Sequence, residues 1–181
     1  MAGFVYLHTV DPSIGCDIKY ATTDNLIGRP IAGYEANTCI VSEKMAHVLH
    51  AVQKTLQPQG LSLVVYEAYR PLKASEDLLW WSLDAQDQKN KATHYPKVEK
   101  SRLYTEHYIL LRSRHNRGAA VDVTLIDKKT GIPLDMGTPF DYMDELSHPA
   151  NTDVGPTIYE RRQNFRALME NYGFMGIQSE W

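Results

Sequence analysis

A single aspartate inside an apolar strand is the feature that most constrains how this chain can fold. The segment AAVDVTLI, residues 119–126, alternates like a buried strand, yet it contains Asp122. A carboxylate in such surroundings is strongly unfavourable unless it is paired or bound to a cation. Asp122 is therefore expected to be paired, to bind a cation or to cap a turn.

The nearest candidate partner is His115, seven residues earlier and separated from Asp122 by Gly118. In one continuous strand, residues seven apart lie on opposite faces because strand side chains alternate. A turn at Gly118 would break the strand and let both side chains converge. Imidazole nitrogen and carboxylate oxygen are both zinc ligands. On these residues alone, a zinc site and a buried aspartate beside a surface histidine are equally consistent interpretations.

The composition predicts one globular domain over residues 1–181, long enough for a sizeable core. Hydrophobic residues make up 43% and charged residues 23%. The net charge of −3 gives no electrostatic footprint for nucleic acid or an anionic membrane. Without signal-peptide features or a membrane-length apolar run, the sequence predicts a cytoplasmic protein. Cys16 and Cys39 are expected to be reduced thiols, with a bridge in an exported protein as the alternative.

The hydrophobic pattern predicts both helices and strands. Helices are expected after the cap residue Ser42, from Pro71 to about Gln88, and after a capping box at Thr157 and Glu160. Strands are expected from Asp17 and over residues 61–69, 107–111, 119–126 and 174–181. Because the strands show no regular βαβ alternation, we expect an α+β fold with a central, mainly antiparallel sheet flanked by helices.

Two further residues fit hydrolytic chemistry. Hydrolysis at zinc requires three protein ligands, an open position for water and a nearby general base. Glu180, on the predicted final strand, is the candidate base. Arg70 follows a predicted strand, where its guanidinium can stabilise a developing oxyanion. Taken singly, a salt bridge between Arg70 and Glu67 and an ordinary exposed Glu180 are the simpler interpretations.

Taken together, the motifs point to one family. The pattern SxHxxGxAxD over residues 113–122 resembles the VanX-type D-alanyl-D-alanine dipeptidases, zinc D,D-peptidases related in fold to hedgehog N-terminal domains. The resemblance covers nearly the whole chain. It is carried also by DIKYATTDN at 17–25, YEAYRP at 66–71, DMGTPFD at 135–141 and GFMGIQSEW at 173–181.

The resemblance implies a hydrolase that cleaves the dipeptide D-Ala-D-Ala into two D-alanines with one zinc ion. His115 and Asp122 are the implied metal ligands, Glu180 the base and Arg70 the residue that polarises the carbonyl. The residues implied to bind the dipeptide are Asp141, which holds its ammonium group, Ser113, Tyr20 and Trp181. The dipeptide is the expected partner, and a homo-oligomer is compatible with the sequence.

The third zinc ligand of the family is absent from the matched positions. In the family it is the histidine of a Glu-Trp-Trp-His motif, whereas this sequence ends at Glu180-Trp181. We expect a truncation just before that histidine. The alternatives are a non-catalytic peptide-binding relative and a substitute ligand among His8, His47, His50, His94, His107 and His148. A zinc peptidase acting on other D,D- or L,D-peptidoglycan peptides is the alternative activity.

Overall fold

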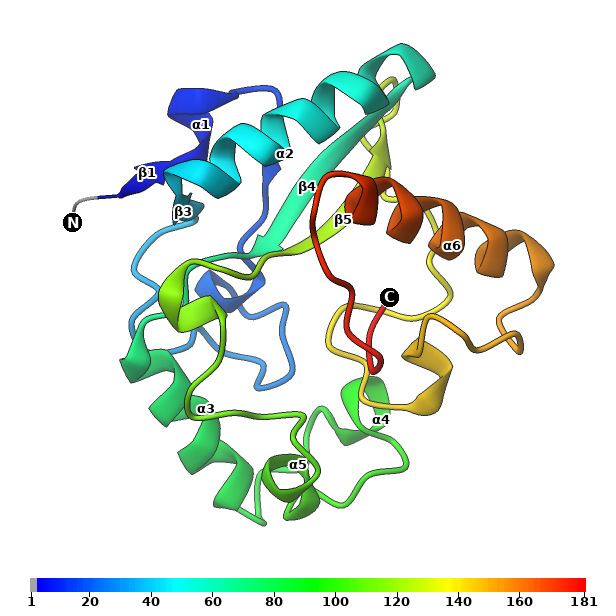
Figure 1. Cartoon of the computed structure of the whole chain (residues 1–181). Coiled ribbons are helices and arrows are strands. Elements are labelled where there is room, and N and C mark those ends of the chain that lie inside the picture. Colours follow the sequence, from blue (N-terminus) through cyan, green and yellow to red (C-terminus); the bar gives the residue numbers. More distant parts are fainter. Residues whose placement is uncertain (1–2) are drawn as a thin grey trace.

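The computed structural model describes residues 3–181 as two small sheets surrounded by helices (Figure 1). Strands β2 (Gly15–Cys16), β4 (Leu61–Glu67) and β5 (Asp122–Asp127) form one sheet, in which β4 pairs parallel to β2 and antiparallel to β5. Strands β1 (Phe4–Tyr6) and β3 (Ile40–Ser42) form an antiparallel pair. The mixed helix and strand content is confirmed. These small sheets do not establish the expected central, mainly antiparallel one.

Three helices are longer than two turns: α2 (Glu43–Leu56), α3 (Leu72–Leu83) and α6 (Pro156–Asn171). The short ones are α1 (Leu7–Val10), α4 (Lys91–His94) and α5 (Arg102–Thr105). Single 3-10 turns are η1 (Lys19–Ala21), η2 (Gln57–Gln59), η3 (His115–Arg117) and η4 (Glu145–Ser147). Within residues 3–181, no helix combines the length and the hydropathy needed to cross a membrane.

Helix α2 forms as its sequence predicts. The Ser42 hydroxyl accepts a hydrogen bond from the Met45 amide at 3.3 Å, which satisfies one of the free donors at the helix start. The apolar positions Leu49 and Val52 are fully buried. After the helix, Gly60 adopts a left-handed conformation with φ of 74°, which turns the chain into β4.

The other two long helices have different ends from those predicted. Helix α3 ends at Leu83 rather than near Gln88 because the buried Lys100 ammonium binds the carbonyl of Asp84 at 2.8 Å, just beyond the helix end. Helix α6 begins at Pro156, a residue suited to the first helical position. Thr157 therefore lies inside the helix, and the predicted capping box does not form.

Three predicted strands are wrong. The chain from Asp17 leads into η1, and residues 107–111 and 174–181 form no strand. For the C-terminal segment the reason is that residues 132–134 already pair with β5 along its outer edge, between Leu125 and Asp127. The Asp127 amide donates to the Ile132 carbonyl at 3.0 Å, and the Leu134 amide donates to the Leu125 carbonyl at 2.8 Å. The tail therefore cannot pair with this part of the β5 edge.

The core consists of two apolar clusters. The first packs α2 and part of α6 against β4 and β5, whereas the second joins α3 and α5 (Figure 1). Tyr34 packs against both clusters. Strand β4 runs through the first cluster and ends at Glu67, so the residues that follow it emerge where the clusters meet.

Candidate active site

His115 and Asp122 converge as the sequence predicts. Gly118 ends η3 with φ of 62°, a left-handed conformation that glycine adopts at little cost. A Cβ at this position would also collide with the Phe4 ring, so both conformation and space require glycine. The turn brings His115 Nε2 to 3.4 Å from Asp122 Oδ1.

The backbone fixes which nitrogen of His115 faces Asp122. Nδ1 lies 2.9 Å from the Ala68 carbonyl oxygen, which can only accept, so Nδ1 carries the hydrogen. Nε2 therefore faces Asp122. Burial alone would lower the pKa of His115, but the Glu67 and Asp122 carboxylates outweigh it and raise that pKa to about 10. The surroundings of this imidazole thus favour a positive charge.

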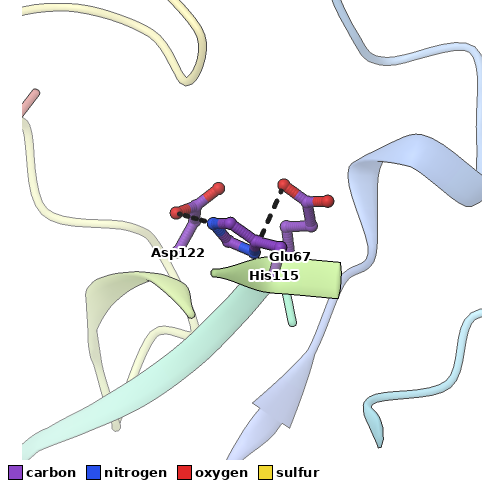
Figure 2. Close-up of side chains that lie close together, drawn as sticks. All are labelled: Glu67, His115 and Asp122. Carbon is purple, nitrogen blue, oxygen red and sulfur yellow. Dashed lines mark ion pairs between the residues drawn. The ribbon is translucent and has the colours of Figure 1, made fainter. Parts of the chain in front are cut away.

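A β-bulge places Glu67 on the other side of the same imidazole. The register between β4 and β5 shifts between Val65 and Glu67, so that Glu67 lies opposite Asp122. Bulges of this kind redirect side chains next to functional sites. Figure 2 shows the His115 ring between the two carboxylates, with Glu67 Oε2 at 3.7 Å from Nδ1. In the part of the chain that the structure describes, these three residues are the group with metal-binding geometry.

The salt bridge between Glu67 and Arg70, which was the simpler interpretation of the sequence, is present in the structure. Its Oε1 accepts from Arg70 Nε at 2.6 Å and its Oε2 from Arg70 Nη2 at 2.5 Å. The Tyr34 hydroxyl donates to Oε1 at 2.6 Å. Burial alone would raise the pKa of Glu67, but the Arg70 and His115 charges and these hydrogen bonds lower it to about 2.

A cavity of about 540 Å³ opens beside this cluster. Apolar side chains from α2 and α6 form part of its wall. Five of the predicted site residues also line it: His115, Asp122, Asp141, Glu180 and Trp181. Arg70, Ser113 and Tyr20 are not part of that lining. The cavity therefore brings the implied base, metal ligands and ammonium-binding residue onto one surface.

Three carboxylates, those of Asp122, Asp141 and Glu180, lie on the wall of this cavity. Burial raises the pKa of Asp141 well above its usual value, and the Glu180 and Asp122 carboxylates raise it further. The surrounding protein and Asp122 likewise raise the pKa of Glu180. Glu180 is exposed at the cavity wall, so solvent screening reduces the rise in its pKa. A bound cation would favour the ionised form of these carboxylates.

The loop that carries Asp141 is held from two sides. Asp141 has a positive φ of 54°, which is rare outside glycine and is concentrated at functional sites. The Tyr20 hydroxyl donates to its Oδ2 at 2.7 Å. The buried Arg162 side chain donates to the Met136 carbonyl at 2.7 Å, which ties the start of the loop to α6. Tyr20 thus orients Asp141.

Glu180 reaches the cavity without the predicted final strand. The Trp181 indole donates to Thr138 Oγ1 at 2.8 Å, which attaches the tail to the Asp141 loop. Ser113 lies on the segment before His115, and its hydroxyl is buried without a hydrogen-bond partner among residues 3–181. The role of Ser113 in binding the dipeptide stays a prediction.

Sequence reasoning missed the wider role of Glu67 and overlooked Tyr34. Glu67 was visible as the i−3 neighbour of Arg70, whereas no motif marks Tyr34. Of the substitute histidines, His94 bonds to the Asp141 backbone and His50 to Asp11. Within residues 3–181, none of the substitutes joins the metal-binding group.

Comparison with known proteins shows the family. A family model described as D-ala-D-ala dipeptidase, of the peptidase M15 family, matches residues 1–181. A D-alanyl-D-alanine dipeptidase of Enterococcus faecalis is 35% identical, and one of Enterococcus faecium is 33% identical; each match covers 99% of this chain and 89% of that protein. One of Escherichia coli is 34% identical over 98% of this chain and 81% of that protein. The chain belongs to the peptidase M15 family of D-Ala-D-Ala dipeptidases.

Proposed function

We propose that this protein is a zinc-dependent dipeptidase that hydrolyses free D-Ala-D-Ala to two D-alanines. The relatives named above carry that activity in their names. The observation that supports it best is the single cavity lined by the His115–Asp122 pair, Glu180 and Asp141. Such a cavity joins two metal donors, a base and a site for an ammonium group.

The donor pair fits zinc. Ligands about 2.0–2.2 Å from a tetrahedral ion lie about 3.4 Å from one another. The separation of His115 Nε2 and Asp122 Oδ1 is 3.4 Å. The unfavourable ionisation of Asp141 and Glu180 in the same cavity adds to the attraction of a cation. When bound, zinc would polarise the scissile carbonyl and acidify water. The family resemblance implies a histidine as the third donor.

Each surrounding side chain has a distinct task in this proposal. The Glu180 carboxylate accepts a proton from the attacking water and delivers it to the departing amine nitrogen. The Arg70 guanidinium donates to the carbonyl oxygen as negative charge develops there. Asp141 accepts hydrogen bonds from the substrate ammonium group. Because an acylated amine carries no charge, Asp141 would select the free dipeptide over longer peptidoglycan stems.

Substrate profiling tests the proposal. We expect the zinc-loaded protein to cleave D-Ala-D-Ala and to leave N-acetyl-D-Ala-D-Ala intact. Cleavage of the acetylated dipeptide at a similar rate would favour the alternative activity on longer peptidoglycan peptides. Binding of D-Ala-D-Ala by calorimetry without any turnover would favour a peptide-binding protein. Either of those results would overturn the proposed activity.

Arg70→Ala is expected to lower kcat by about 10²–10³-fold, the usual cost of removing one oxyanion donor. KM should change little, because the oxyanion exists only in the transition state. Steady-state kinetics with D-Ala-D-Ala measures both constants. The matched control is Arg29→Ala, since Arg29 forms a similar two-point pair with the Asp77 carboxylate at 2.7 and 2.8 Å outside the cavity. A loss that appeared equally in KM would assign Arg70 a binding role.

Asp141→Asn is expected to raise KM for D-Ala-D-Ala about 10- to 100-fold, because a hydrogen bond to a charged group is lost. The kcat value should fall much less, since the reacting bond is not touched. The control is Asp135→Asn at the exposed start of the same loop, where the remaining amide oxygen still accepts from Gly137. An unchanged KM in Asp141→Asn would remove this residue from the ammonium site.

A further inference from the structure

We infer that Glu67 is a positioning residue for the proposed reaction: it holds the Arg70 guanidinium by one edge and leaves the other edge for the substrate. The inference rests on the proposed function. It extends that function to a residue outside the cavity lining.

The hydrogen bonds divide the guanidinium into two edges. Nε and Nη2 of Arg70 donate to the two oxygens of Glu67, at 2.6 and 2.5 Å. Nη1 makes no protein hydrogen bond among residues 3–181, so its hydrogens remain for another acceptor. A planar guanidinium held at two points cannot rotate about its bonds without breaking both. Glu67 thereby sets the direction of the free edge.

The carboxylate is itself rigidly held. The Glu67 side chain is 0% exposed, and Tyr34 donates to its Oε1 at 2.6 Å. The β-bulge fixes its place opposite Asp122. The Arg70 amide also donates to the His115 carbonyl at 3.1 Å, which joins the guanidinium-bearing residue to the imidazole-bearing turn. Arg70 and His115 are therefore oriented by one common support, as preorganised electrostatic catalysis requires.

The same geometry argues against Glu67 as a metal ligand. Glu67 lies on the Nδ1 side of His115, whereas Asp122 lies on the Nε2 side (Figure 2). Both Glu67 oxygens already accept hydrogen bonds, so coordination would require breaking the pair with Arg70. Removing the Glu67 charge should thus weaken turnover far more than zinc binding.

The first test is Glu67→Gln. A glutamine has one acceptor oxygen, and its amide group opposes the guanidinium donors, so the two-point grip is lost. At saturating zinc we expect kcat to fall by about 10²-fold with KM near the wild-type value. Zinc affinity should fall by about tenfold, the low end of the range for residues that support a metal site from outside. Loss of zinc binding would overturn the inference in favour of a ligand role. Asp77→Asn, which breaks the Arg29 pair elsewhere, is the control and should leave kcat unchanged.

Glu67→Asp keeps the buried charge and therefore serves if the glutamine variant does not fold. It withdraws the carboxylate by one methylene group, so the guanidinium is displaced. We expect kcat to fall and KM to stay near the wild-type value. A wild-type kcat in Glu67→Asp would show that only the charge matters, and this would overturn the positioning role.

Chemical rescue provides the decisive comparison. In Arg70→Ala, Glu67 still offers its carboxylate to a guanidinium ion from solution. We expect guanidinium chloride to restore kcat in a saturable manner in Arg70→Ala, by about tenfold or more, and to restore nothing in the double variant Glu67→Gln/Arg70→Ala. Equal rescue in both variants, or rescue in neither, contradicts the inference. A wild-type protein without turnover instead rejects the proposed function itself, so the two failures are distinguishable.

Discussion

Replacing Glu180 by glutamine is expected to lower kcat by about 10²–10⁴-fold, the range that general acid–base catalysis contributes. Glutamine has nearly the same shape as glutamate but cannot take a proton from water at neutral pH. Glu180 lines the same cavity as His115 and Asp122, and the surrounding protein raises its pKa, so it is a stronger proton acceptor than an ordinary carboxylate. KM and zinc content should remain close to wild type, because neither depends on the proton transfer. Kinetics with D-Ala-D-Ala and metal analysis measure these quantities.

The matched control for that variant is Glu170→Gln on α6. Glu170 is exposed and accepts from Arg166 at 2.8 Å, so the same chemical change removes only a surface ion pair. We expect wild-type kinetics from it. Should Glu180→Gln instead retain wild-type kcat, the proton would have to pass through another group, and the proposed role of Glu180 would be rejected.

The approach of His115 to Asp122 could be anticipated from the sequence as one of two interpretations that the residues allowed. A carboxylate in an apolar strand is unfavourable without a partner, and a turn at Gly118 can bring His115 to it. A buried aspartate beside a surface histidine fitted the same residues. Helix α2 was predictable because its cap and its apolar spacing agree. Where several local signals agree, the pattern determines the structure.

Other features depend on pairing partners that no local pattern reveals. The bulge between Val65 and Glu67 exists because β4 and β5 shift register, and only the paired strands define it. It is this shift that sets Glu67 opposite Asp122 and beside His115. The sequence pointed to the ion pair with Arg70 but gave no sign of the imidazole contact. Tyr34 packs against both apolar clusters and donates to Glu67. This contact arises only in the tertiary structure, so no local sequence pattern predicts it.

Glu180 lies at the cavity although the secondary structure predicted for the C-terminal segment is wrong. The tail was predicted as a strand, but residues 132–134 occupy the edge of β5. The indole of Trp181 instead fastens the tail to Thr138, and this brings Glu180 to the cavity. The family motif therefore singled out a residue that lines the cavity. The hydrophobic pattern of the tail, by contrast, wrongly predicted a strand there.

Removing the imidazole should abolish both metal binding and turnover. We expect His115→Ala to weaken zinc binding by more than about 10³-fold, because a metal site that loses one of its few protein donors holds the ion poorly. Activity toward D-Ala-D-Ala should fall to background together with the zinc content. Asp122→Ala is expected to behave in the same way, since its Oδ1 lies 3.4 Å from His115 Nε2 on the metal side of the ring. Metal analysis after dialysis, followed by kinetics at saturating zinc, measures both effects.

The pattern of losses separates a ligand from a residue that merely supports the fold. His47→Ala is the matched control, because His47 is exposed on α2 and does not line the cavity. It should keep both zinc and activity. If His115→Ala retained stoichiometric zinc, the cation would be held elsewhere, and Asp122 would be left beside a cavity without the partner that its apolar strand demands. Excess zinc restoring part of the activity in His115→Ala would agree with the proposal, since a weakened site still fills at high metal concentration.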